Sequence, residues 1–238
     1  MRRDYSHPSI VSWVPFNESW GVPDLPRSAE QRDLVRAVYH LTKALDPTRP
    51  VIANDGWEFV AGEVIGIHDY ALRGDELRLR YGTAEAIDAA LRGRPQSRRA
   101  MLDDAIRCDQ PVILSEFGGI TLTPQPGTAW FGYGSVADEE AFAARYEELV
   151  SAVLDSTALA GFCYTQLTDT EQETNGLLRA DRSPKLPLER IRRITRRPSR
   201  SIPGDSIWAA QQATLEVAEG TSEGVPSASD ASQGRGAG

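Results

Sequence analysis

Residues 7–21 read HPSIVSWVPFNESWG and residues 111–119 read PVILSEFGG, and these two stretches carry the clearest signals of the fold. In each, a short apolar run rich in β-branched or aromatic residues leads to a glutamate, Glu18 or Glu116, with small residues soon after it. Apolar runs of this length predict buried strands. The sequence therefore places one carboxylate at the carboxyl end of each of two strands.

Strand-like and helix-like segments alternate through the rest of the chain. Strands are expected at residues 10–17, 50–54, 64–70, 111–117 and 161–167. Segments whose apolar residues recur at helical spacing lie between them at 29–45, 84–107 and 137–154, and a further one lies at 188–194. Such alternation predicts parallel βα units. No GxGxxG or GxxxxGK[ST] motif follows any of the strands, which favours a barrel over a doubly wound nucleotide-binding sheet.

The two strand-end glutamates suggest a reaction. In a (β/α)8 barrel the carboxyl ends of the strands carry the active site. Cleavage of a glycosidic bond needs two carboxyl groups, one to protonate the leaving oxygen and one to attack the anomeric carbon or activate water. The alternative is that each glutamate only caps a strand or the following helix.

The same stretches resemble glycoside hydrolase family 2, the family of β-galactosidases, β-glucuronidases and β-mannosidases. Residues 7–21 resemble its acid/base signature, 111–119 its nucleophile strand, and 161–178 its last barrel strand. The resemblance spans about residues 1–187. It implies a partial (β/α)8 TIM barrel, strands 4–8 with their helices, as a catalytic domain over residues 1–198.

Roles follow from the resemblance residue by residue. It implies that Glu18 is the general acid and then base, and that Glu116 is the nucleophile of a retaining double displacement. Asn17 is expected to bind the sugar 2-hydroxyl, and Tyr70 to hydrogen-bond the nucleophile. Neither a cofactor nor a metal is expected.

Further residues are expected to contact the sugar, each with a structural alternative. His68 would reach a sugar hydroxyl or be a satisfied strand histidine. Trp57 and Trp130 would stack on pyranose faces or anchor loops. Gln166 lies where many family members carry a tryptophan that floors the sugar site, and this departure affects the preferred sugar.

A second departure concerns the extent of the barrel. Residues 10–17 correspond to strand 4, so strands 1–3 are missing from the expected set. We therefore expect the C-terminal fragment of a longer enzyme, whose partner is the missing half of the barrel or a second copy. The alternative is a truncated remnant that binds carbohydrate without turnover.

Composition narrows the remaining possibilities. The net charge of −8 argues against nucleic-acid binding, and no apolar run approaches the roughly 18 residues of a membrane span. The first residues lack the apolar segment of a secretory signal, so a cytoplasmic location is expected. Ser, Gly and Ala make up half of residues 199–238, which predicts a disordered tail.

The expected sugar is a neutral hexose such as a β-galactoside. A glucuronidase of the family is expected to show an Asn-x-Lys pair that binds the uronate. None of the three asparagines is followed by such a lysine.

Overall fold

A row of five parallel strands organises the chain. The computed structural model describes residues 1–238 except 103–104, 106–108, 123–131, 203, 205–206 and 209–238. The strands of the row are β1 (Phe16–Asn17), β2 (Asn54–Asp55), β3 (Ile65–Asp69), β4 (Val112–Gly118) and β7 (Gly161–Thr165). β1 pairs with β2, and β3, β4 and β7 form one sheet, all in parallel.

Gly56 connects the two groups of strands. Its N–H donates to the carbonyl of Gly66 at 3.2 Å, and its carbonyl accepts from the N–H of His68 at 3.2 Å. The row therefore runs in chain order, as consecutive strands of a βα barrel do. Within the described residues β1 and β7, at its two ends, do not pair, so this part of the chain forms an open section of a barrel.

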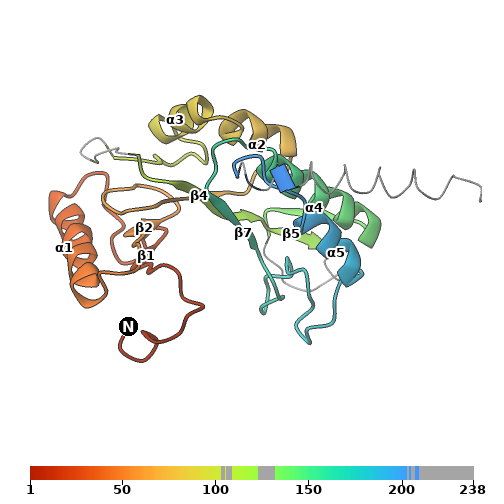
Figure 1. Cartoon of the computed structure of the whole chain (residues 1–238), viewed down its shortest axis with the longest axis horizontal. Helices are drawn as coiled ribbons and strands as arrows, with labels where there is room; N and C mark the ends of the chain where they lie inside the picture. The colour runs from red at the N-terminus through yellow and green to blue at the C-terminus, as the bar shows by residue number, and fades with distance from the viewer. Residues whose placement is uncertain (103–104, 106–108, 123–131, 203, 205–206, 209–238) are drawn as a thin grey trace, which may run out of the picture.

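Two apolar cores lie between strands and helices. The larger joins β3 and β4 to the helices α2 (Gly74–Tyr81), α3 (Ala84–Arg92), α4 (Glu139–Leu154) and α5 (Leu188–Thr195). The smaller lies under α1 (Ala29–Leu45) and includes Val22, Leu25, Val35 and Ala53. Figure 1 shows α1 beside β1 and β2, and the other helices around β4 and β7.

Helix ends follow capping chemistry. α1 spans residues 29–45, as predicted, because Ser28 accepts from the N–H of Gln31 and Pro47 follows its end. The predicted helix 84–107 is wrong directly after Arg92, where α3 ends, since Gly93 and Pro95 interrupt the helical backbone. Residues 103–104 and 106–107 of that prediction lie outside the described residues. Helix α2 was not predicted.

The strands also differ from expectation in length. The predicted strand 10–17 pairs continuously only at Phe16 and Asn17, with one isolated bridge from Trp13 to Val51, because Pro15 has no N–H to donate. Two short strands that the sequence did not suggest, β5 (Ile120–Leu122) and β6 (Gly134–Val136), pair in parallel with each other. The five-strand parallel arrangement is confirmed.

Two further expectations concern the termini and membranes. Most of the segment 199–238 lies outside the described residues, so the predicted disordered tail stays a prediction. None of the described helices is both long and apolar enough to cross a membrane.

Candidate active site

Glu18 stands on a sharp turn at the carboxyl end of β1. Its backbone has a positive φ of 54°, and its N–H donates to the carbonyl of Asp55 at 3.0 Å. The next residue, Ser19, is buried, donates its N–H to Asn54 Oδ1 at 3.0 Å and its hydroxyl to Glu58 at 2.6 Å. These bonds hold the turn against the end of β2 and fix the backbone position from which the Glu18 side chain extends.

Glu116 lies on β4, directly across from His68 on β3 in the strand register. Its Oε2 accepts a short hydrogen bond from the hydroxyl of Tyr70, the residue that follows β3. The ring of Tyr133 stacks on Tyr70 with centroids 3.5 Å apart and planes 6° from parallel. Tyr70 is thereby held in position to orient one face of the Glu116 carboxylate.

His68 joins the two carboxylates. Its Nδ1 lies 2.8 Å from Glu18 Oε1 and 3.3 Å from Glu116 Oε2, while its Nε2 lies 3.4 Å from Asp55 Oδ2. The imidazole is only 1% exposed. It therefore lies beneath the two glutamates, hydrogen-bonded to Glu18 through Nδ1 and with Nε2 facing Asp55.

Asp55 is held from its other side by β4. Its Oδ1 accepts from the hydroxyl of Ser115 at 2.6 Å. This contact passes over Gly66 on β3, where an added Cβ would lie 1.7 Å from the same Oδ1. A glycine at this position lets β2 and β4 side chains meet across the intervening strand.

The charges of this cluster shift its ionisation. Burial lowers the pKa of His68, but its contacts with Asp55 and Glu18 and the charge of Glu116 outweigh burial and raise the pKa to about 9. Burial raises the pKa of Glu116, against the opposing effect of the Tyr70 hydrogen bond and of His68. Burial and Glu116 also raise the pKa of Tyr70, so its hydroxyl stays protonated and donates.

The same three side chains could in principle hold a cation. One ligand atom each from Glu18, His68 and Glu116 lie within 4.8 Å of one another. A ligating histidine must be neutral, whereas the raised pKa of His68 keeps its proton in place at neutral pH. The absence of a metal stays a prediction.

The other predicted sugar contacts lie at different distances from this centre. Asn17 is exposed beside Glu18 at the end of β1. Trp57 packs edge-on to His68, with ring centroids 5.8 Å apart. Gln166 follows β7 and donates to Asn175 at 2.7 Å, so its amide is engaged in the C-terminal loop. Trp130 lies outside the described residues.

The structure adds residues that the sequence alone did not single out. Tyr133, which buttresses Tyr70, comes from a segment with no strand or helix signal. Asp69, next to Tyr70, is buried and pairs with Arg80 at 2.7 Å and with the hydroxyl of Tyr81 at 2.7 Å. It supports β3 and does not contact Glu18 or Glu116.

A cavity opens beside Glu18. It has a volume of about 430 Å³ and is lined by Glu18, Ser19, Trp20, Gly21, Pro23, Trp57 and Arg98. We call it the Glu18 cavity. The indole of Trp20 is 77% exposed, and the guanidinium of Arg98 lies 4.9 Å from the centre of the Trp57 ring. Two aromatic rings and one carboxylate thus border a space large enough for a sugar.

Parallel βα units with two carboxylates at the strand ends are the arrangement found in the (β/α)8 barrels of glycosidases. The chain belongs to the glycosyl hydrolases family 2, TIM barrel domain, whose family model matches residues 1–197. Among curated proteins no sequence matches the chain.

Solved structures share the fold. The chain is similar to a family 2 β-galacturonidase from Eisenbergiella tayi, with a TM-score of 0.56 and 19% identity over 82% of this chain and 34% of that one. It is also similar to a β-D-glucuronidase from Dictyoglomus thermophilum, with a TM-score of 0.53 and 20% identity over 82% and 33%. A β-glucuronidase from Bifidobacterium dentium gives a TM-score of 0.53 and 22% identity over 82% and 32%. The chain thus spans about a third of the length of these structures.

Proposed function

We propose that this chain carries the catalytic residues of a β-glycosidase that retains the anomeric configuration. The observation that carries the proposal is the closeness of two strand-end carboxylates: an oxygen of Glu18 lies within 4.8 Å of an oxygen of Glu116. Carboxyl groups are about 5–5.5 Å apart in retaining glycosidases and about 6.5–9.5 Å apart in inverting ones, which leave room for a water. The short separation supports a double displacement.

In the first step Glu116 attacks the anomeric carbon. A bond forms between a Glu116 oxygen and this carbon as the bond to the leaving oxygen breaks. Glu18 gives its proton to the leaving oxygen, so the aglycone departs as a neutral alcohol. Tyr70, which donates to Glu116, orients the carboxylate and holds it deprotonated for the attack.

In the second step a water replaces the aglycone. Glu18, now ionised, takes a proton from this water. At the same time the water oxygen attacks the anomeric carbon, and the ester bond to Glu116 breaks. His68, whose Nδ1 lies 2.8 Å from Glu18 Oε1, orients this carboxyl group through both steps. Asn17, exposed beside Glu18, is proposed to bind the sugar 2-hydroxyl.

We propose a neutral hexoside, such as a β-galactoside, for the sugar that Glu116 attacks. The sequence has no Asn-x-Lys pair, and both lysines are engaged elsewhere: Lys43 pairs with Glu63 at 3.0 Å and Lys185 with Asp169 at 2.7 Å. The similar structures are named as uronidases, but at this low identity the likeness extends to the fold alone.

Covalent trapping tests the mechanism and the sugar together. The chain is incubated with activated 2-deoxy-2-fluoro β-glycosides of galactose, glucose, mannose and glucuronic acid, and its intact mass is measured. We expect a one-sugar adduct that peptide mapping places on Glu116, formed fastest from a neutral sugar. Glu116→Gln removes the adduct, whereas the exposed control Glu189→Gln keeps it.

Other outcomes would change the assignment. An adduct on a different residue would reject Glu116 as the nucleophile, and fastest trapping by the glucuronide would reject the neutral sugar. No adduct from a folded chain would favour a remnant that binds carbohydrate without turnover.

A further inference from the structure

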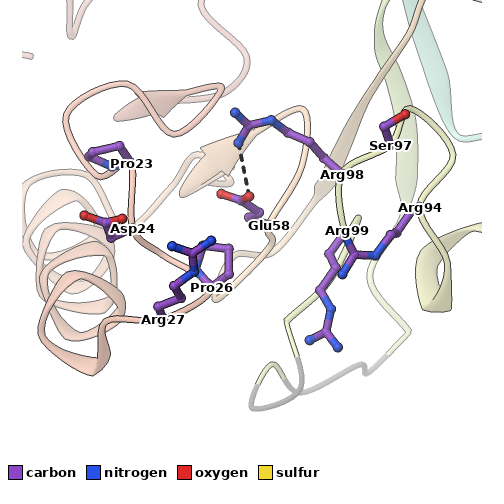
Figure 2. A pocket seen from close by; sticks show the side chains of 9 residues that line it. All are labelled: Pro23, Asp24, Pro26, Arg27, Glu58, Arg94, Ser97, Arg98 and Arg99. Carbon is purple, nitrogen blue, oxygen red and sulfur yellow. Dashed lines mark hydrogen bonds and ion pairs between the residues drawn. The ribbon is translucent and has the colours of Figure 1, made fainter.

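A second cavity lies next to the Glu18 cavity. It has a volume of about 610 Å³ and shares Pro23 and Arg98 with its neighbour. Its wall also carries Arg27, from the loop before α1, and Arg94 and Arg99, from the segment after α3 (Figure 2). We call it the arginine cavity. Guanidinium groups thus face it from two separate parts of the chain.

The charge of the arginine cavity contrasts with that of the whole chain. Four arginines line it against two acidic residues, Asp24 and Glu58, although the net charge of the protein is −8. One of these acids is already used, since Glu58 accepts from Arg98 at 3.1 Å (Figure 2) and from Ser19 at 2.6 Å. The arginine cavity is therefore a local concentration of positive charge.

Arg27 and Arg94 line the arginine cavity without a side-chain partner among the residues that the structure describes. Both side chains are exposed, and neither has an ion pair or a side-chain hydrogen bond within the described residues. Arg98, in contrast, is held by Glu58 and lies over the ring of Trp57. We therefore treat Arg98 as part of the wall between the two cavities, and Arg27 and Arg94 as groups that can bind a ligand.

The position relative to the reaction indicates which part of a substrate would reach this cavity. In the proposed function Glu18 protonates the leaving oxygen, so the leaving group lies on the Glu18 side of the cleaved bond. The Glu18 cavity is lined by Glu18 and not by Glu116. A leaving group that fills it would extend past Pro23 and Arg98 into the arginine cavity.

We propose that the arginine cavity binds an anionic group, a uronate carboxylate or a sulfate ester, on the leaving-group sugar. This inference rests on the proposed function, because that function sets which side receives the leaving group. Guanidinium groups form paired, charge-assisted hydrogen bonds with planar or tetrahedral oxyanions, which a neutral sugar does not offer. The enzyme would thus select a neutral sugar at Glu116 followed by a charged one.

Binding of non-hydrolysable disaccharides tests the proposal. Three ligands carry galactose joined through sulfur in β-linkage to glucose, glucuronate or glucose 6-sulfate, and calorimetry measures the affinity of the full chain for each. We expect at least one anionic disaccharide to bind about tenfold more tightly than the neutral one, as a charge-assisted contact gives. Which anion is preferred distinguishes a carboxylate from a sulfate.

Matched variants locate the contact. The double variant R27Q/R94Q should lose the preference for the anionic ligand and keep the affinity for the neutral one. The control R193Q/R196Q removes the same charge from exposed positions at the end of α5 and should behave like the wild type. Equal affinities for the three ligands, a preference that survives in R27Q/R94Q, or no binding of either anionic ligand would overturn the proposal.

The outcomes separate this inference from the proposed function. An adduct on Glu116 without any charge preference would overturn the inference alone. A charge preference that depends on Arg27 and Arg94, without any adduct, would overturn the catalytic function and leave an anion-binding cavity.

Discussion

At the scale of single residues, His68 couples the acidic groups of the site. Its two nitrogens face Glu18 and Glu116 on one side and Asp55 on the other, at 2.8 to 3.4 Å. Acidic groups this close to one another disfavour each other's ionised forms, and a positive charge among them offsets this effect. The positive charge that the raised pKa favours on His68 therefore helps to hold Glu18 and Glu116 close together.

This coupling predicts a pH dependence of stability. Because folding raises the pKa of His68 from 6.5 to about 9, its contribution is complete below about pH 6.5 and is lost as the pH rises through 9. The contribution is on the order of 3 kcal/mol. Urea unfolding between pH 6 and 10 should show this loss in the wild type but not in His68→Gln. Parallel pH curves for the two proteins would contradict the prediction.

The effect of replacing Glu18 on the rate of hydrolysis is expected to depend on the leaving group. Glu18→Ala should slow hydrolysis of alkyl glycosides by about 10²–10⁴-fold, because a poor leaving group needs a proton. Activated aryl glycosides, which barely need protonation, should lose far less. Steady-state rates on a series of leaving groups measure the difference, and equal losses throughout the series would exclude Glu18 as the acid.

At the scale of elements, close contacts between parallel strands determine where the side chains meet. Asp55 from β2 reaches Ser115 on β4 only because Gly66 on β3, between them, has no side chain. The pair positions Asp55 beside His68. A glycine in the middle of a strand is here a requirement of the site.

The prediction at this scale compares two strand glycines. Gly66→Ala should lower the free energy of unfolding by about 1–3 kcal/mol or more, because its Cβ would overlap Asp55 and approach Ser115 Oγ to 2.8 Å. Gly161→Ala on β7 is the control: its Cβ would meet only Ile113 at 3.4 Å, and the expected change is at most about 1 kcal/mol. Urea denaturation measures both, and similar values would contradict the role assigned to Gly66.

At the scale of the whole molecule, the five strands form a row with two ends. β4 is hydrogen-bonded on both sides, by β3 and β7, whereas in the described residues β1 is bonded only to β2. The larger core packs against β3 and β4, and the smaller core under α1 supports the β1 end. Stability is therefore expected to decrease from β4 toward β1.

Hydrogen exchange measures this gradient. Amides of β3 and β4 should be the most protected and should exchange only with global unfolding, while the amides of Phe16 and Trp13 should exchange by local opening. Protection of β1 equal to that of β4 would contradict an open end and would indicate that a second copy covers it. Hydrogen exchange measured at low and at high protein concentration tests for the second copy, because protection by a second copy increases with concentration.

Much of the fold was predictable because the signals are local. The apolar strand runs, the Ser28 cap and the Pro47 stop of α1 each lie within a few residues of the feature that they specify. The shortening of α3 was visible in principle in Gly93 and Pro95, but the alanine-rich composition of residues 84–92 outweighed them in the sequence interpretation. The strands β5 and β6 are too short for any periodicity to predict them.

The parallel βα order and the two strand-end glutamates could be predicted from the amino-acid sequence, since each depends on residues close together in the chain. The positions of His68 beneath both glutamates, of Tyr133 against Tyr70, and of Arg27 and Arg94 at one cavity became known from the folded structure. These contacts join residues that are dozens of positions apart, and side-chain distances across neighbouring strands and loops set them. No local pattern in the chain records such distances.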